Sequence, residues 1–411
     1  MALSEKKTVL SVIILAGLIT FLRWPEILSD AQFWAEDGMF WWPEARAKGL
    51  ASLWLPHTGY FQTDDRLVAL LAVFFPLAWG PALFACAALF FEVLPPAFLV
   101  SSRCAVICPS LLLRSCLALA WCALPNTWEV HGNLTNSQWH LGLLSFLIVM
   151  SSPPQTRRSW IFDIFFLGVS AVSGPFSILL TPVAALRAWW LPSKASITRV
   201  IILGAGALIQ AVCIYMSQRG VPPLLGATPM NFVRLMSGQI ILATIVGCHH
   251  LPHWYGLAIW RYMVLPCLLF IAAAWLCLNA AYRWSSFRYA LFFTVLILGA
   301  CLSHPLPLSH GEQVWVRMRM PDTGMRYLFL PLVFWVSVVV AQALAAPRGW
   351  TRNLAIVFLF LIMCVGVPRD WRFMPEADRQ FYDIAHYFDH APPGTRVTIP
   401  VRPGAEAVLI R

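Results

Sequence analysis

Residues 327–345, YLFLPLVFWVSVVVAQALA, form a run without a charged side chain. A helix of about 20 apolar residues spans the hydrocarbon core of a bilayer, so this run predicts a membrane-spanning helix. The whole chain has the same character, since 59% of its 411 residues are hydrophobic and 12% are charged. Soluble domains carry about 25% charged residues, so the composition excludes a soluble fold. It also excludes disorder, which requires low hydrophobicity.

Further apolar runs predict an all-α polytopic membrane protein with about 11 transmembrane helices. Ser173-Gly174-Pro175 divides the run 159–190 into two short halves, which fits a hairpin of short helices inside the bilayer. Together with these two halves, the expected spans are residues 8–22, 81–100, 106–124, 138–151, 200–216, 260–281, 289–303, 327–345 and 353–367. Residues 217–259 are expected to form an outer loop that carries one helical segment.

The charge pattern predicts the orientation of these spans. Lys6 and Lys7 precede the first helix, and Lys and Arg favour the cytoplasmic side of a membrane. We therefore expect a cytoplasmic N terminus, with most of the net charge of +10 in inner loops. Membrane orientation then explains most of the basic residues, so a nucleic-acid partner is not expected. Residues 1–367 then form the transmembrane domain, with a first extracytoplasmic loop at 23–66, and residues 368–411 form a short extracytoplasmic C-terminal segment.

The first outer loop, residues 23–66, contains two acidic pairs. Glu36 and Asp37 lie among the aromatic residues Trp34, Phe40, Trp41 and Trp42. Aromatic rings favour the membrane interface, so a carboxylate held there can act as a general base or hold a cation. A solvated acid or a helix cap would also explain the pair. Asp64 and Asp65 precede an apolar helix, which favours capping, although a two-carboxylate or divalent metal site stays open.

The loop at 304–326 carries three arginines on the expected outer side, Arg317, Arg319 and Arg326. Guanidinium groups bind phosphate or diphosphate in a bidentate manner. The alternative is that these side chains reach toward the headgroups of membrane lipids.

Residues 131–140 place uncharged polar groups beside an aromatic ring at the outer end of the span 138–151. Asn133, Asn136 and His140 with Trp139 suit sugar recognition by hydroxyl pairing and stacking. The alternative for Asn136 is helix capping.

Other polar residues have plainer interpretations. His249, His250 and His253 suggest zinc, but Pro252 opposes a regular helix there, so an interfacial turn is favoured. Glu92 and Arg114 lie within apolar runs and are expected to pair with each other. Asp163 is expected only to reach toward the interface. The 11 Cys show no CxxC pair and no disulfide framework.

The order of these features resembles the GT-C glycosyltransferases, and more narrowly their bacterial polytopic members. The resemblance covers the chain from the first loop to the span 327–345. Its motifs are Trp34-Ala35-Glu36-Asp37-Gly38, Gly59-Tyr60, Arg66-Leu67, Gly132 to Asn136 with Trp139, Ser173 to Phe176, and Arg326-Tyr327.

The resemblance implies an inverting sugar transfer from a polyprenyl-phosphate donor at the outer face of the bacterial inner membrane. It assigns the catalytic base to Asp37, with Glu36 as neighbour or substitute. Donor phosphate binding falls to Arg326 and Tyr327, with Arg317 or Arg319 in support. The acceptor is a glycan, a lipid or a protein. No cofactor is certain. The remaining substrate-binding residues are Tyr60, Asp64, Asp65, Arg66, Asn133, Asn136, Trp139 and His140. Thr63-Asp64-Asp65 departs from the family pattern, which has apolar residues and Pro before Arg66.

Two other functions remain as alternatives. A transporter or flippase of a lipid-linked saccharide would carry charged residues at the midplane and symmetry-related broken helices, and the sequence has one obvious break. A membrane acyltransferase would need a histidine base or a nucleophile, for which His57, His131 and His140 are candidates.

Overall fold

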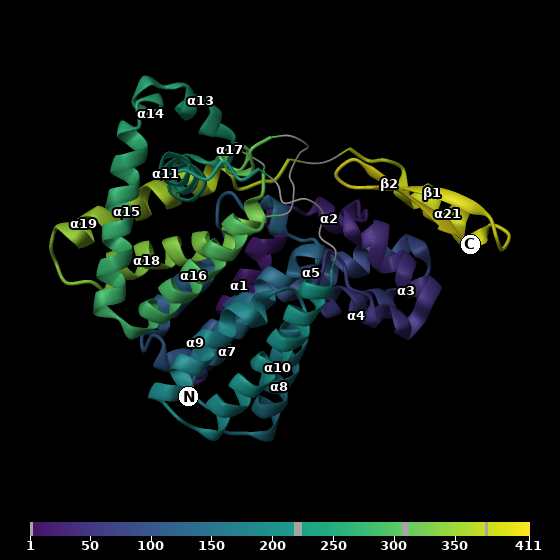
Figure 1. The fold of residues 1–411 in the computed structure, drawn as a ribbon, viewed down its shortest axis with the longest axis horizontal. Helices are drawn as coiled ribbons and strands as arrows, with labels where there is room; N and C mark the ends of the chain where they lie inside the picture. Colours follow the sequence, from purple (N-terminus) through teal and green to yellow (C-terminus); the bar gives the residue numbers. More distant parts are fainter. Residues whose placement is uncertain (1–2, 218–223, 306–311, 322, 375–376) are drawn as a thin grey trace.

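The computed structural model describes residues 3–217, 224–305, 312–321, 323–374 and 377–411. Within these ranges the chain is mostly helical, which confirms the predicted helical membrane architecture (Figure 1). The C-terminal segment adds a hairpin that the sequence analysis did not predict. Its strands β1 (Arg396–Val401) and β2 (Ala405–Ile410) pair antiparallel, with Arg396 opposite Ile410. Part of the loop 304–326, residues 306–311, lies outside the described residues.

Seven described segments are long and apolar enough to cross a membrane. Six of them match expected spans, whereas the segment at 229–246 was expected as a helix within an outer loop. The expected total of 11 spans stays a prediction. The seven segments are Leu77–Leu99, Lys194–Met216, Pro229–Val246, Val264–Arg283, Ser285–Ser303, Met325–Ala345 and Trp350–Arg369.

The remaining expected spans form helices that are short or carry charges at both ends. A helix rises 1.5 Å per residue, so a helix of 15 residues extends about 22 Å, less than the roughly 30 Å hydrocarbon core. These helices are α1 (Leu3–Arg23), α6 (Leu111–Cys122), α7 (Ser137–Met150), α8 (Arg157–Ala171) and α9 (Phe176–Trp190).

Two helices form the centre of the bundle. Every residue of α7 is buried, and α18 (Phe329–Ala345) is buried from Phe329 to Ala343. A helix that is apolar on all sides belongs inside a larger assembly, and other helices surround these two. The other long helices are α5 (Gly80–Leu99), α10 (Lys194–Met216), α15 (Val264–Arg283) and α16 (Ser285–Ser303). The shorter α19 (Trp350–Leu361) begins the long segment Trp350–Arg369.

Short helices occupy the connections between the long ones. Those of the first loop are α2 (Glu26–Ser29), the π-helix η1 (Asp37–Trp41), α3 (Trp42–Lys48) and α4 (Thr63–Ala72). The later ones are α13 (Leu251–Gly256), α14 (Ala258–Arg261), α17 (Val314–Arg317) and α21 (Phe381–His390). By contrast, α11 (Pro229–Leu235) and α12 (Ala243–Val246) belong to the long segment Pro229–Val246, and α20 (Val367–Arg369) ends the long segment Trp350–Arg369.

The break between α8 and α9 is the point where the first loop docks on the membrane helices. Gly174 has a φ of +73°, and a Cβ there would collide with Gln138. Its amide donates to the Phe61 carbonyl at 2.9 Å. Gln210 of α10 accepts from the Phe61 amide at 2.9 Å and donates to the carbonyls of Phe61 and Gly174 at 3.1 Å each. The break therefore anchors the first loop.

The C-terminal segment packs against the first loop and shares its core. Figure 1 shows α21, β1 and β2 beside α3 and α4 at one end of the molecule. One buried cluster joins Phe33, Trp41 and Trp42 of the loop to α21 and β1. Arg402 also pairs with Asp30 at 2.6 Å. Loop and tail thus pack together as one body.

Candidate functional site

A cavity of about 350 Å³ opens between the first loop, the start of α7 and the start of α18. Six of the fourteen predicted site residues line it: Glu36, Tyr60, Asn136, Trp139, Arg326 and Tyr327. The other eight lie outside its lining: Asp37, Asp64, Asp65, Arg66, Asn133, His140, Arg317 and Arg319.

The cavity has a polar wall and an apolar wall. Polar groups come from the first loop and from residues 135–138. The apolar side is built from α9, α10 and α16 and includes Leu179, Ile214 and Ile297. A ligand with a polar head and an apolar tail matches this division, because each part then meets groups of its own kind.

Glu36 and Asp37 are adjacent in sequence but have different surroundings. Glu36 is half-buried and lines the cavity, whereas Asp37 is buried behind the wall. Ala35 has a φ of +37°, a left-handed conformation that an alanine adopts at a cost. Its amide donates to the Arg402 carbonyl at 2.6 Å. The C-terminal segment therefore holds the turn that presents Glu36.

The Asp37 carboxylate accepts three hydrogen bonds from residues 134–135. The donors are the Leu134 amide at 3.3 Å, the Thr135 amide at 3.0 Å and the Thr135 hydroxyl at 2.8 Å. Burial raises the pKa of Asp37 from 3.8 to about 8, although the Thr135 hydroxyl opposes the shift. Thr135 itself lines the cavity, so it contacts both Asp37 and the open space.

Asp64 and Asp65 are buried in the first turn of α4, which confirms the expected placement at the start of a helix, but neither is its N-cap. The N-cap position is Gln62, and its side chain makes no capping bond. Asp64 accepts from the Ser137 hydroxyl at 2.6 Å. Among the described residues, neither carboxylate oxygen of Asp65 has a hydrogen-bond partner. Burial raises the pKa of both acids, and the charges of Asp64 and Asp37 raise that of Asp65 further.

Arg66 supports the site from behind the cavity wall. It is buried, donates to Glu44 at 2.7 Å and lies over the Trp41 ring at 4.8 Å. The Trp41 indole donates to the Thr135 hydroxyl at 3.0 Å. This chain of contacts fixes the residue that hydrogen-bonds Asp37.

The three arginines of the loop 304–326 do not converge. Arg326 lines the cavity and pairs with Glu129, whose oxygens accept from Nη1 at 2.6 Å and from the Arg326 amide at 2.9 Å. Arg317 is exposed beside Glu312 at 3.9 Å, and Arg319 donates to Asn231 at 3.0 Å. Sequence reasoning missed Glu129, because its partner lies 197 residues further along the chain.

Trp139 is the aromatic platform of the cavity. Its ring packs edge-on against Phe176, with the centroids 4.9 Å apart. Asn136 lines the cavity beside it and donates to the Glu129 carbonyl at 2.8 Å. Asn133 and His140 instead satisfy backbone carbonyls, with His140 Nε2 2.9 Å from the Val130 oxygen. The expected capping of α7 by the Asn136 side chain is absent.

Sequence reasoning also missed Gln62 and Gln210. Gln62 lines the cavity, and Gln210 fixes the first loop from within an apolar helix. A polar residue inside a membrane span is a functional candidate by default, so this signal was available for Gln210.

The expected pair between Glu92 and Arg114 is wrong. Glu92 contacts His131 Nδ1 at 2.7 Å and accepts from the Gly132 amide at 3.3 Å. Arg114 donates to backbone carbonyls at the end of α5, including that of Val100 at 3.0 Å. Helix ends leave carbonyls without intrahelical donors, and Arg114 satisfies them.

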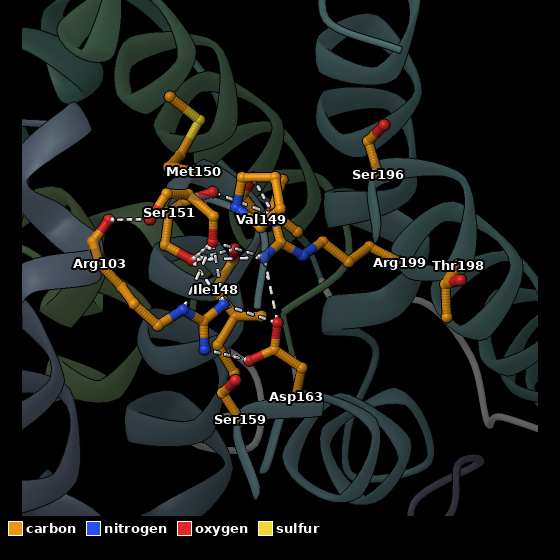
Figure 2. A network of polar contacts seen from close by, with 12 residues as sticks. Arg103, Ile148, Val149, Met150, Ser151, Ser159, Asp163, Ser196, Thr198 and Arg199 are labelled. Carbon is orange, nitrogen blue, oxygen red and sulfur yellow. Dashed lines mark hydrogen bonds and ion pairs between the residues drawn. The ribbon is translucent and has the colours of Figure 1, made fainter. Parts of the chain in front are cut away.

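Asp163 lies in a network of arginines instead of reaching toward the interface as expected. Figure 2 shows Arg103 and Arg199 directed at its carboxylate from two sides. Arg103 donates to both oxygens, at 2.6 and 2.7 Å, and Arg199 donates at 3.0 Å. Ser151, after α7, binds both arginines. The network joins α7, α8 and α10. It lies beside the end of α5 that is distant from the first loop.

One group of side chains among the described residues is suited to hold a metal ion. No three acids of the two acidic pairs in the first loop lie close enough together to chelate one ion, whereas Cys248, His249 and Asp370 do. His250 and His253 are exposed and do not belong to this group. The triple-histidine arrangement is therefore not formed.

Comparison of the chain with family models, with curated proteins and with solved structures found no match. The chemistry assigned to the site therefore depends on its residues and their geometry.

Proposed function

We propose that the protein is an inverting glycosyltransferase that moves a sugar from a polyprenyl-phosphate donor to an acceptor in this cavity. The supporting observation is the convergence of a carboxylate, an aromatic platform and an arginine on one space that has an apolar wall. These groups are Glu36, Trp139 and Arg326. Each suits one part of the reaction: the acceptor hydroxyl, the sugar ring and the donor phosphate.

The proposed step forms one bond and breaks one. The acceptor oxygen attacks the anomeric carbon while the bond from that carbon to the phosphate oxygen breaks, and polyprenyl phosphate leaves with the bonding electrons. The acceptor proton passes to a carboxylate. Phosphate is already a good leaving group, so positioning and charge stabilisation are the main contributions of the protein.

The cavity geometry favours Glu36 as the base, while the family resemblance favours Asp37. A base must lie within hydrogen-bonding reach of the proton that it removes, and Glu36 lines the cavity. Asp37 holds Leu134 and Thr135 from behind the wall. In this proposal Glu36 is the catalytic residue and Asp37 is a positioning residue.

Arg326 is proposed to contact the donor phosphate. Its pairing with Glu129 fixes the guanidinium group at the cavity wall. The apolar helices α9, α10 and α16 would accommodate the start of the polyprenyl chain. In this arrangement the apolar wall of the cavity faces the lipid, and we expect the donor to enter from that side.

One observation favours acyl transfer as a second candidate. His57 lines the cavity, and burial lowers its pKa, which favours the neutral imidazole that a base requires. His131 and His140, the other two candidates, are buried outside the lining.

The test uses purified full-length protein in lipid vesicles with labelled polyprenyl-phosphate sugars and an envelope extract as acceptor. Transfer should release polyprenyl phosphate and place label on the acceptor. Glu36→Gln should abolish both, while the exposed variant Asp383→Asn should not. Movement of intact donor across the bilayer without cleavage would identify a flippase. An acyl-transfer activity that is lost in His57→Ala but kept in the other two variants would identify an acyltransferase.

A further inference from the structure

Three metal-ligating side chains meet outside the candidate site, where the C-terminal segment begins. The ligand atoms of Cys248, His249 and Asp370 all lie within 4.8 Å of one another. Cys248 and His249 belong to the 3₁₀ turn η8 (Cys248–His250), and Asp370 ends α20. Residues 122 positions apart thus come together at one point.

The backbone holds Asp370 in place at this point. Its carboxylate accepts from the Cys248 amide at 2.8 Å and from the Asn126 amide at 3.0 Å. Gly247 makes this approach feasible, since its φ is +82° and a Cβ there would lie 2.7 Å from Asp370 Oδ1. Each carboxylate oxygen has two lone pairs, so these bonds leave acceptor capacity for a cation.

A cavity of about 270 Å³ lies against all three side chains. Zinc sites combine thiolate, imidazole and carboxylate ligands, and sites with three protein ligands keep a fourth position for water. The cavity provides room for that water. We propose that Cys248 Sγ, an imidazole nitrogen of His249 and the Asp370 carboxylate bind one Zn²⁺ ion.

The surrounding charges are compatible with this ion. A thiolate and a carboxylate balance the two charges of Zn²⁺. Arg372, which lines the same cavity, pairs with Glu26 at 2.7 Å. Arg23 donates to the Asp370 backbone carbonyl at 3.3 Å, to the Cys122 carbonyl and to Thr127. Arg23 also interacts favourably with Glu92, so its charge is partly compensated from the other side.

The site would connect the C-terminal segment to the rest of the protein. Asp370 precedes the segment that packs on the first loop, and Cys248 follows α12. Asn126, whose amide bonds Asp370, lies three residues before Glu129, the partner of Arg326. The ion would therefore stabilise the attachment of the tail, and this role is independent of the reaction in the candidate site.

Zinc analysis of untagged full-length protein in detergent, after dialysis against trace Zn²⁺, tests the proposal. We expect about one Zn²⁺ per chain and almost none in Cys248→Ser, His249→Ala or Asp370→Asn. The matched controls are His250→Ala and Cys267→Ser, because both residues are exposed and lie outside the group. Both controls should keep the zinc.

Cobalt substitution provides a readout that does not depend on the stability of a variant. Wild-type protein loaded with Co²⁺ should show thiolate-to-cobalt charge-transfer absorption, and Cys248→Ser should lack it. His249 is exposed, so His249→Ala should elute as folded protein while it loses the metal. The proposal is overturned if the wild type binds no stoichiometric Zn²⁺, if Cys248→Ser retains it, or if His250→Ala loses it equally.

Discussion

A single buried carboxylate at one end of α5 and three buried carboxylates at the other end differ in how their charge is balanced. At one end, Asp163 receives two arginines and its oxygens accept three charge-assisted bonds. At the other end lie Asp37, Asp64 and Asp65, which are equally buried. Asp37 and Asp64 accept from hydroxyl and amide groups, and Asp65 lacks a hydrogen-bond partner among the described residues.

The difference separates a structural network from a site that is suited to chemistry. The two arginines that donate to Asp163 make its carboxylate a junction that joins α7, α8 and α10. A buried carboxylate without a cation resists ionisation, and its pKa rises. The first loop holds these three acids outside the cavity lining, while the neighbouring Glu36 lines the cavity and is the proposed base.

The largest effect is expected from Glu36→Gln. This change keeps the shape of the side chain but removes its ability to accept a proton. Loss of a general base reduces turnover by about 10²–10⁴-fold, measured as label transferred per minute in vesicles. Asp163→Asn should leave transfer unchanged at a temperature where it is folded. Equal activity of Glu36→Gln and wild type would contradict the assignment of the base.

Asp163→Asn should instead cause the largest loss of stability. Removing one partner of a buried ion pair costs about 3–5 kcal/mol because the remaining charge is uncompensated, and Arg199 is 5% exposed. The measurement is the thermal unfolding midpoint of detergent-solubilised protein. Asp383→Asn, which changes an exposed acid, is the control. An unchanged midpoint would show that the network is not structural.

Arg326→Lys should have a moderate effect on the donor. Lysine keeps the charge that pairs with Glu129 but loses the planar fork that binds phosphate in a bidentate manner. We expect the KM for the polyprenyl-phosphate sugar to rise about tenfold, or about 1.4 kcal/mol. Arg317→Lys, at an exposed position outside the cavity, should leave the KM unchanged. Equal effects of the two changes would contradict the phosphate assignment.

Asp37→Asn should alter the pH dependence of stability. Burial raises the pKa of Asp37 from 3.8 to about 8, so the folded protein keeps a proton that the unfolded chain releases. The resulting stabilisation is complete below the unfolded pKa and is lost as the pH rises to about 8. The unfolding midpoint of wild type should fall over this range, and that of Asp37→Asn should fall less. An identical slope in both proteins would contradict the raised pKa.

The sequence predicted much of the helical architecture but fewer of the side-chain partners. Apolar runs identified six of the seven long segments because burial in lipid requires continuous apolar length. Composition could not place Pro229–Val246, which is long enough to span although it was expected within an outer loop. It also could not predict that Glu92 contacts His131 instead of Arg114, since an apolar run does not specify which side chains face each other.

The amino-acid sequence by itself determined that this chain is a helical membrane protein and that its unusual charges gather in a few connections. Hydrophobic burial in lipid depends on composition over about 20 residues, so it can be read locally. Only the tertiary structure decided that Glu36 faces the cavity while Asp37 faces Thr135, and that Cys248 meets Asp370. Those outcomes depend on contacts between residues distant in the chain, which fix the direction of each side chain.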